Sequence, residues 1–486
     1  MVEIRTERYK QEAVKAIKDR VLQNALSNFQ NRIAKATRAA YGNLPEGPEL
    51  RRKAHDIRMH TIENLDVHLE MFAEKVRSHG GLVHFARDAG EAVDYCLDVA
   101  RRHNVRSVVK GKSMVTEEIG LNDALRNAGI EAAETDLGEY IVQLAGEHPS
   151  HIIAPAIHKT REQVGELFAS RLGIPYTDHP PTLTRAARKA LREKFLAADM
   201  GVSGCNLACA ETGHITVVSN EGNIRMSTTM PRVHVVFMGM ERIVARLEDH
   251  DVLFRLLARG AAAQNMPGYV SYVGGPRQPG QVDGPDELHV VILDNGRSKI
   301  LADEEFREIL CCIRCAACLN VCPVYGKIGG HTYGYPYCGP IGAVVTPLFV
   351  GIDRAKDLCL GETLCGACRD QCPLHIDIPR MLLALRFKLA YGDKRWKVTA
   401  TSPGERMLFT LWSWLIRLPR VYEWCLKLLS HAQKLLPANR GMISRLPYPF
   451  QGWTRSRDMK RLAGKSFRQR WNEDRLQHDE IGRSAR

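Results

Sequence analysis

Two runs of closely spaced cysteines constrain this chain more than any other feature. Ten of the fourteen cysteines lie between positions 311 and 372. The first run, CIRCAACLNVCP, has the spacing C-x2-C-x2-C-x3-C-P, which bacterial ferredoxins use to hold cubane iron–sulfur clusters. The second run, CGACRDQCP, has the same spacing without its first cysteine. The spacing therefore predicts two adjacent [4Fe-4S] clusters and a role in electron transfer.

The register of the two runs assigns most of the cluster ligands. Three thiolates separated by two residues can curl around one cubane, and the fourth cysteine of such a run ligates the other cluster. The predicted ligands of cluster 1 are Cys312, Cys315, Cys318 and Cys372. The predicted ligands of cluster 2 are Cys322, Cys365 and Cys368, together with one further group.

The eighth ligand is the open question. The register places it at position 362, where the chain has Glu362. The nearby thiols are Cys338 and Cys359, and we expect Cys359 to complete cluster 2 because it lies three residues before that position. If neither thiol reaches, the cluster has an oxygen ligand or only three irons. Cys311 fits neither register and is expected to be a bystander.

Zinc binding and disulfide bonding are the two alternatives for these cysteines. Structural zinc usually takes two C-x2-C pairs separated by a long gap, and a third cysteine followed by C-P does not fit that pattern. Disulfides need an oxidising compartment. The first twenty residues are charged throughout and lack the apolar core of a secretory signal. No run approaches the ~18 apolar residues of a membrane span, so we expect a cytoplasmic protein.

Positive charge is concentrated in the C-terminal part of the chain. Residues 380–486 contain 23 Lys or Arg and 8 Asp or Glu, a net charge of +15, whereas residues 1–379 have a net charge of −2. Such asymmetry points to an acidic partner, an anionic membrane surface or nucleic acid. Nucleic acid is not expected, because the tryptophans of this part lie among leucines instead of forming stacking platforms. We favour a docking surface for a partner subunit over peripheral membrane contact or a merely solvated basic face.

The chain is expected to have four parts. Residues 1–80 form a helical N-terminal region, 81–296 an α/β domain, 297–390 an α-helical two-cluster ferredoxin-like domain, and 391–486 a basic helical C-terminal extension. Apolar spacing predicts N-terminal helices over 1–40 and 49–77. The alternation of strand-like and helix-like segments after about residue 82 predicts a parallel sheet flanked by helices. The expected strands are 106–110, 130–135, 151–156, 214–220, 232–239, 268–275 and 287–294, and the expected helices lie near 117–128, 138–146 and 159–171.

The α/β domain carries no recognised nucleotide motif. The segment VVKGKS ends like a P-loop, but Arg106 stands where that loop requires glycine. No G-x-G-x-x-G follows a strand, so a Rossmann site is unsupported. Residues 201–223 are dense in Gly, Ser, Asn and Glu, which fits either a ligand pocket or two turns between strands. Cys205 and Cys209 have no nearby partners and are expected to be small buried residues.

The order of these parts resembles the lactate utilization protein B family, the iron–sulfur protein of the bacterial L-lactate oxidation system. The matching segments in the α/β domain are KSMVTEEIGLNDAL (112–125), ETDLGEYIVQL (134–144), PSHIIAPAIH (149–158), SGCNLACAETG (203–213) and SNEGN (219–223). Those in the cluster domain and the tail are CIRCAACLNVCPVY (312–325), GPIGAV (339–344), LCGACRDQCP (364–373) and RSRDMKRLAGKSFRQRW (455–471).

This resemblance implies a three-protein system that oxidises L-lactate to pyruvate. The implied partners are a cysteine-rich iron–sulfur subunit and a small subunit with a lactate-utilization (LUD) domain. It also implies that residues 81–296 form a LUD domain with a CoA-transferase and ribose-isomerase-like fold. The seven register cysteines are the implied cluster ligands, and family members tend to lack a cysteine at position 362.

We therefore expect an electron-transfer subunit, because no flavin or nicotinamide site is visible. The alternative is that the LUD domain is itself a catalytic or substrate-binding unit, with Glu211 and Glu221 as acid–base candidates.

Overall fold

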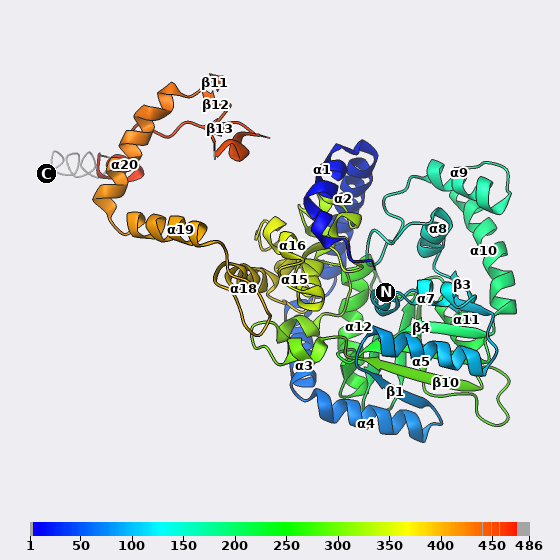
Figure 1. Ribbon diagram of the computed structural model, residues 1–486. Coiled ribbons are helices and arrows are strands. Elements are labelled where there is room, and N and C mark those ends of the chain that lie inside the picture. The colour runs from blue at the N-terminus through cyan, green and yellow to red at the C-terminus, as the bar shows by residue number, and fades with distance from the viewer. Residues whose placement is uncertain (1–2, 440, 449, 456, 474–486) are drawn as a thin grey trace. The chain divides into compact units, whose positions relative to one another are not determined.

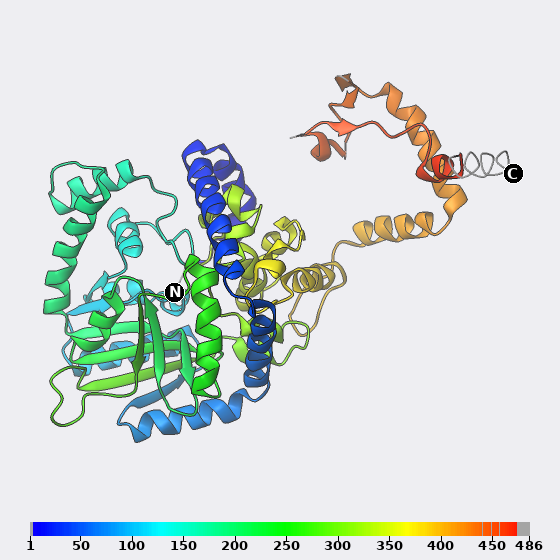
Figure 2. The same cartoon turned by 180° about the vertical axis from the view of Figure 1, so that it is seen from behind.

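The computed structural model describes residues 3–439, 441–448, 450–455 and 457–473 (Figures 1 and 2). The chain forms two compact units, Met1–Ala400 and Thr401–Arg486. Within the described residues, no helix is long and apolar enough to cross a bilayer.

The N-terminal region consists of four helices instead of the two expected. These are α1 (Tyr9–Lys18), α2 (Arg20–Gly42), α3 (Gly47–Glu63) and α4 (Leu65–Ser78). The expected helix over 1–40 is interrupted at Asp19, whose backbone is extended and whose carboxylate accepts the N–H groups of Val21 and Leu22. Asp19 therefore ends one helix and caps the next. The expected helix over 49–77 is interrupted at Asn64, whose side-chain amide donates to the carbonyl of His60 at 2.8 Å.

A six-stranded parallel sheet forms the centre of the α/β domain, in the order β1-β10-β7-β4-β2-β3. Its strands are β1 (Leu82–Ala86), β2 (Ser107–Lys110), β3 (Glu131–Glu134), β4 (Met200–Gly204), β7 (Val233–Gly239) and β10 (Glu287–Leu293). One face packs against α5 (Ala89–Arg102), α6 (Met114–Ile119) and α7 (Leu121–Asn127). The parallel sheet flanked by helices that the sequence predicts is therefore present.

The opposite face of this sheet packs against α4 and a second sheet, in the order β8-β5-β6-β9. The second sheet contains β5 (Leu207–Cys209), β6 (Ile215–Ser219), β8 (Ile243–Val244) and β9 (Tyr269–Val273). Five further helices complete the domain, namely α8 (Leu137–Ala145), α9 (Arg161–Leu172), α10 (Pro180–Ala197), α11 (Asn223–Thr229) and α12 (Leu247–Ala262).

One expected strand is wrong. Residues 151–156 form bends and turns without strand pairing. The Nδ1 atom of His151 accepts the N–H groups of Ile153 and Ala154, both at 3.0 Å. A side chain thus takes the backbone donors that a strand would offer to its neighbour. The remaining expected strands lie within two residues of the observed ones.

The cysteine-rich region folds as short helices around a core shared with α1, α2, α3 and α12. Its elements are α13 (Arg297–Leu301), α14 (Tyr325–Ile328), α15 (Gly339–Val350), α16 (Lys356–Gly361), α17 (Ala367–Gln371) and α18 (Ile378–Tyr391), with short 3-10 turns at Arg307–Cys311, Leu319–Val321 and His331–Tyr333. Tyr325, Tyr333 and Tyr337 of the Gly- and Tyr-rich insert are almost fully buried. The insert is therefore part of the core.

The second unit is built from α19 (Pro403–Ile416), α20 (Pro419–Ala432) and a small antiparallel sheet of β11 (Ala438–Asn439), β12 (Met442–Ile443) and β13 (Met459–Lys460). α19 buries none of its residues. Trp412, Trp414 and Trp424 are 50%, 61% and 64% exposed. The unit thus leaves a large apolar surface uncovered.

Candidate metal centre

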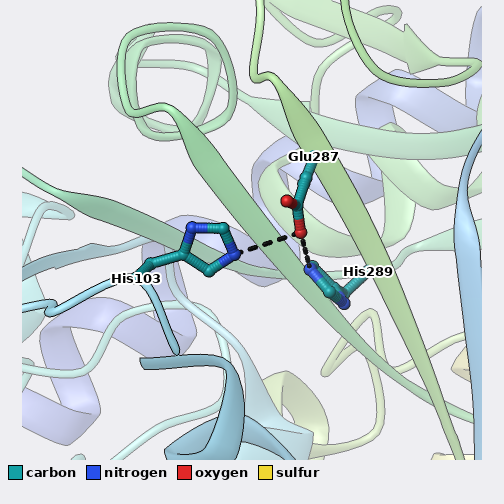
Figure 3. Close-up of side chains that lie close together, drawn as sticks. All are labelled: His103, Glu287 and His289. Atoms are coloured by element: carbon teal, nitrogen blue, oxygen red, sulfur yellow. Dashed lines mark hydrogen bonds and ion pairs between the residues drawn. The ribbon is translucent and has the colours of Figure 1, made fainter. Parts of the chain in front are cut away.

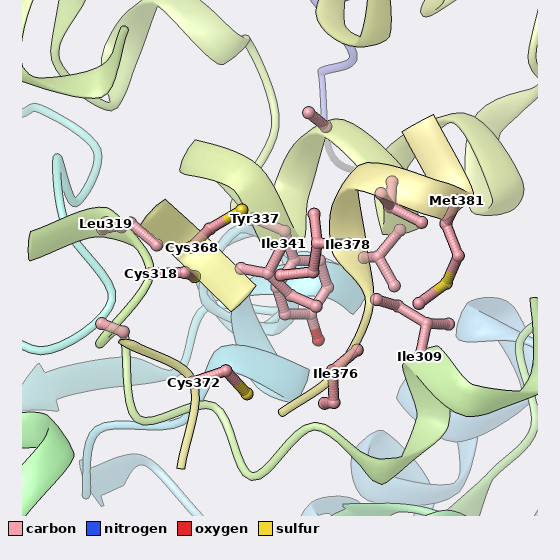
Figure 4. Close-up of a cluster of buried hydrophobic side chains, with 14 of the residues drawn as sticks. Ile309, Cys318, Leu319, Tyr337, Ile341, Cys368, Cys372, Ile376, Ile378 and Met381 are labelled. Atoms are coloured by element: carbon pink, nitrogen blue, oxygen red, sulfur yellow. The ribbon is translucent and has the colours of Figure 1, made fainter. Parts of the chain in front are cut away.

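Four cysteines from two separate segments of the sequence line one cavity. They are Cys312, Cys315, Cys318 and Cys372. The side chains of Ile341, Ile376 and Ile378 also line the cavity. Figure 4 shows these three isoleucines with Cys318 and Cys372. The structure therefore brings together the four residues that the register assigns to cluster 1, including the one from the second run.

The backbone of the first run is wound tightly around this cavity. Arg314 and Ala316, which alternate with the cysteines, have left-handed φ values of 58° and 60°. Such conformations cost non-glycine residues on the order of 1–3 kcal/mol and persist where the surroundings impose them, often at functional sites. The N–H of Arg314 also donates to Cys312 Sγ at 3.4 Å. The loop is thus shaped to aim its thiols inward.

The spacing of the sulfur atoms argues against a single zinc ion. Tetrahedral zinc with Zn–S bonds of about 2.3 Å holds its sulfurs about 3.8 Å apart. Within the described part of the chain, only His103, Glu287 and His289 place three potential metal-binding atoms within 4.8 Å of one another. The cysteines of the cavity are spread more widely. Wider spacing is what a cubane requires, because each cysteine then binds a different iron.

Arginines surround this first site. Arg242 donates to the carbonyl oxygens of Cys312 at 2.9 Å and Ile313 at 3.3 Å. Arg58, which is fully buried, donates to the carbonyl of Cys311 at 3.4 Å. Arg51 donates to the carbonyl of Cys372. Burial raises the pKa of the Cys315 thiol, so bound iron is what would hold it as the thiolate.

The second site joins Cys322 to a carboxylate. Cys322 Sγ lies 3.6 Å from Glu362 Oε2. The Tyr333 hydroxyl donates to Glu362 Oε1 at 3.1 Å, and Glu362 is only 8% exposed. Two cysteines of the second run are the remaining predicted ligands of this site. Cys368 lies in α17 and is buried, and Cys365 lies just before α17 and is exposed. Leu364, just before Cys365, has a left-handed φ of 58°. The second loop thus repeats a feature of the first.

The remaining thiols of the region are engaged elsewhere. Cys359 Sγ donates to the carbonyl of Lys356 at 3.2 Å, within α16. Cys338 Sγ points to the carbonyl of Ser150 at 3.9 Å. Cys311 Sγ lies 3.3 Å from Met59 Sδ. The structure therefore places Glu362 beside Cys322, and not Cys359 as expected, because the turn of α16 directs Cys359 to its own helix backbone.

A buried ionic network links the α/β domain to the first site. Arg297 is fully buried and contacts Glu118 at 2.8 Å and Glu241 at 2.7 Å. Glu241 also faces Arg314 at 3.6 Å. The Tyr337 hydroxyl donates to Glu118 at 2.6 Å. Burial lowers the pKa of Arg297, but attraction to Glu118 and Glu241 outweighs this effect and the pKa rises well above its ordinary value.

Most side chains of residues 201–223 serve the backbone. Asn206 accepts the N–H of Val218 at 2.8 Å. Glu211 accepts the N–H of Leu247, and Glu221 that of Leu137, both at 3.1 Å. These contacts favour the scaffold interpretation over a pocket. They also weaken Glu211 and Glu221 as acid–base candidates.

A different group of charges lies where β2 and β3 end. Lys110 is fully buried and contacts Glu134 at 2.8 Å and Glu117 at 3.2 Å. Neither carboxylate oxygen of the nearby Glu139 has a hydrogen-bond partner, although the residue is only 2% exposed. Burial raises the pKa of Glu139 well above its ordinary value, and Glu134 adds to that shift. Burial therefore favours the neutral form of Glu139.

His103, Glu287 and His289 form a second compact group (Figure 3). Glu287 Oε2 lies 3.1 Å from Nε2 of each imidazole, and the Tyr95 hydroxyl lies 2.9 Å from Nδ1 of His289. Two neutral imidazoles can donate to this carboxylate, so these hydrogen bonds satisfy the group without a metal. They connect the end of α5 to the start of β10.

Comparison with known proteins assigns the family. The LUD domain family matches residues 69–293, the 4Fe-4S dicluster domain matches 308–376, and the C-terminal domain of lactate utilisation protein B matches 394–475. Lactate utilization protein B of Bacillus licheniformis is 42% identical over 98% of both chains. That of Bacillus subtilis is 41% identical over 98% of both.

The chain belongs to the lactate utilization protein B family. A further relative, the uncharacterized electron transport protein YkgF of Escherichia coli, is 42% identical over 96% of both chains. A solved structure of a duf162 family protein from Deinococcus radiodurans aligns with 47% of this chain and 98% of its own, at 14% identity and a TM-score of 0.27.

In this member of the lactate utilization protein B family, sequence reasoning missed the charged residues around the clusters. Arg58, Arg242 and Arg297 contact residues that are far away in the sequence. No local spacing marks them. Among the charged residues near the two sites, only Glu362 could be singled out from the sequence, because it stands at a ligand position of the cysteine register.

Proposed function

We propose that this chain is the electron-transfer subunit of a multi-protein system that oxidises L-lactate to pyruvate. Cys312, Cys315, Cys318 and Cys372 would hold one [4Fe-4S] cluster, and Cys322, Cys365 and Cys368 would hold three irons of a second. The observation that carries the proposal is the cavity lined by four cysteines of both runs. Oxidation of L-lactate releases two electrons and two protons, and each bound cluster supplies a one-electron carrier.

The charges around the two sites favour electron flow from the second site to the first. Positive charge stabilises a reduced cluster, which is the more negative form. Arg242 and Arg58 donate to backbone carbonyls of the first site. The Glu362 carboxylate adjoins the second site. Exposed Cys365 offers a nearby partner access to the second site. Hydride removal from lactate is assigned to a partner.

Lactate should reduce the clusters only when the partner subunits are present. The anaerobically prepared chain would be mixed with L-lactate, alone and with the cysteine-rich iron–sulfur subunit and the small LUD-domain subunit. Electron paramagnetic resonance would then follow the reduced clusters. We expect no reduction of the isolated chain, because it shows no hydride-accepting motif. Rapid lactate turnover by the isolated chain with an artificial acceptor would contradict the proposal.

The second candidate function is catalysis by the LUD domain itself. It is favoured by Glu139, a buried carboxyl without a hydrogen-bond partner, beside Lys110 and Glu134 near the carboxyl ends of β2 and β3. Ligands of open parallel sheets bind at this edge. A CoA-transferase and ribose-isomerase-like fold, which we propose for this domain, would place its site there too. If the isolated chain does oxidise lactate, Glu139→Gln is the first variant to test.

The exposed apolar surface of α19 and α20 is proposed to dock the partner subunits. In the full chain, replacing Trp412, Trp414 and Trp424 together by serine should abolish co-purification with the partners and leave the iron content unchanged. These side chains are at least half exposed, so their loss removes contact area without opening a core. Tyr176→Ser, at a 57% exposed site in the other unit, is the matched control.

A liposome-flotation assay with anionic lipid distinguishes membrane contact from docking. Partner binding by the triple variant, together with flotation of the unchanged chain, would favour the membrane instead. Because the cluster thiols must stay reduced, we propose that the chain works in the cytoplasm.

A further inference from the structure

We propose that the Glu362 carboxylate is the eighth cluster ligand and binds the fourth iron of cluster 2 through oxygen. This inference rests on the two-cluster function proposed above and goes beyond it, because it identifies a ligand that is not a thiol. It also replaces Cys359, the thiol expected from the sequence.

The register of the two runs supports this assignment. The first run has Cys312, Cys315, Cys318 and Cys322, and the second has Glu362, Cys365, Cys368 and Cys372. Glu362 thus stands at the position equivalent to Cys312. Each run begins three residues before its second ligand and ends with the residue that crosses to the other cluster.

The folded chain repeats this equivalence in space. At the first site, Cys312 lines the same cavity as Cys372, the crossing residue of the other run. At the second site, Glu362 Oε2 lies 3.6 Å from Sγ of Cys322, which is the crossing residue of the first run. Glu362 therefore lies beside the crossing residue of the other run, as Cys312 does at the first site.

The carboxylate is held by hydrogen bonds and forms no ion pair among the described residues. Tyr333 donates to Oε1 at 3.1 Å, which leaves Oε2 directed at Cys322. Arg386 binds the backbone carbonyl of Glu362 at 2.7 Å. None of the ion pairs found among the described residues includes the carboxylate, although Glu362 is only 8% exposed. Burying a carboxylate without a positive partner is costly. A bound iron would supply the missing charge.

The two competing thiols are committed elsewhere. Cys359 Sγ donates to Lys356 of its own helix, and Arg386 fixes the carbonyl of Cys359 at 2.8 Å. Cys338 Sγ faces the carbonyl of Ser150. Moving the Cys359 thiol into the second site would break its hydrogen bond to Lys356.

An oxygen ligand predicts a labile corner in cluster 2. Iron–sulfur clusters prefer soft thiolate ligands, so a carboxylate holds its iron less firmly. Ferricyanide would accept one electron from the [4Fe-4S]2+ cluster and become ferrocyanide. The resulting [4Fe-4S]3+ cluster would release Fe2+ from the Glu362 carboxylate and leave [3Fe-4S]+, which electron paramagnetic resonance detects.

The test compares four full-length proteins reconstituted without oxygen. These are the unchanged chain, Glu362→Cys, Glu362→Ala and Cys359→Ala. Each is assayed for iron and titrated with ferricyanide. The unchanged chain and Cys359→Ala should carry about eight irons and yield about one three-iron cluster per chain. Glu362→Cys should keep about eight irons and lose most of that signal, while Glu362→Ala should show the signal before ferricyanide is added.

Two outcomes are decisive against the inference. If Glu362→Cys and Glu362→Ala both match the unchanged chain, Glu362 is not a ligand, and a changed spectrum of Cys359→Ala would reinstate the thiol. If the unchanged chain itself binds only about four irons, the two-cluster function fails together with this inference. The iron content therefore separates the two failures. A Cys315→Ser background, which lacks cluster 1, shows that the three-iron signal comes from cluster 2.

Discussion

Replacing Cys315 by serine should remove one whole cluster and reduce the iron content from about eight to about four per chain. Cys315 is 6% exposed and lines the first cavity together with Cys312, Cys318 and Cys372. A hydroxyl at this position is a poor ligand for iron. Cys315 is the middle one of three closely spaced thiolates, so we expect its loss to detach the loop from the cubane and not to free a single iron. Iron and sulfide assays and the visible absorbance of the reconstituted chain measure the loss.

Cys311→Ser is the matched control for this prediction. Cys311 is as buried as Cys315 and adjoins Cys312, but its thiol lies against Met59 Sδ. We expect both clusters to remain in this variant. Equal iron loss in the two variants would mean that disturbing the fold, and not removing a ligand, causes the effect.

Cys372→Ser makes the crossed connection of the two runs testable. Cys372 belongs to the second run, yet it lines the first cavity. The electron paramagnetic resonance spectrum of Cys372→Ser should therefore match that of Cys315→Ser, and the cluster bound by Cys322 should remain. If Cys372→Ser instead keeps the cluster bound by Cys312, Cys315 and Cys318 and loses the other, each run binds its own cluster and the connection is not crossed.

The sequence predicted which four cysteines lie together at the first site, because the ligand spacing is a local property. Three of its four cysteines are separated by two residues each, and any chain that wraps a cubane must repeat that spacing. The crossing of Cys372 was predicted from its place as the last cysteine of its run, which in two-cluster ferredoxins ligates the other cluster. The cavity lined by these four residues agrees with that prediction.

The second site was predicted less well, because proximity in the sequence is not proximity in space. Cys359 lies three residues from the vacant position, but α16 turns its thiol to the carbonyl of Lys356. The expected strand over 151–156 failed for a related reason, since the His151 side chain takes two backbone donors. In both cases a local hydrogen bond directs the side chain, and neither proximity in the sequence nor apolar periodicity reveals it.

The charged partners of the first site could not be predicted at all. Arg242 reaches Cys312 across 70 positions, and Arg58 reaches Cys311 across 253. Such pairs depend on how the α/β domain packs against the cysteine loop, which is a property of the complete fold. The Arg297 network is the most strongly buried example.

Arg297→Met should destabilise the chain severely, by about 3–5 kcal/mol, which is typical when one partner of a buried ion pair is removed. Arg297 is fully buried between Glu118 and Glu241, at 2.8 and 2.7 Å. Methionine fills much of the same volume but leaves two buried carboxylates, of which only Glu241 still faces an arginine, Arg314 at 3.6 Å. The thermal midpoint of the reconstituted protein, measured without oxygen, should fall by several degrees or the soluble yield should collapse.

Two further variants identify the cause of this loss. Arg232→Met breaks an ion pair with Asp286 at 2.8 Å in which the arginine side chain is 87% exposed, so the midpoint should not move. Arg297→Met combined with Glu118→Gln and Glu241→Gln removes the uncompensated charges and should recover part of the midpoint. If the triple variant is no more stable than Arg297→Met, the buried carboxylates do not cause the loss, and the packing of Arg297 over the Phe349 ring, at 4.9 Å, becomes its source. Recovery would instead show that the network stabilises the junction between the α/β domain and the cysteine loop through charge neutralisation.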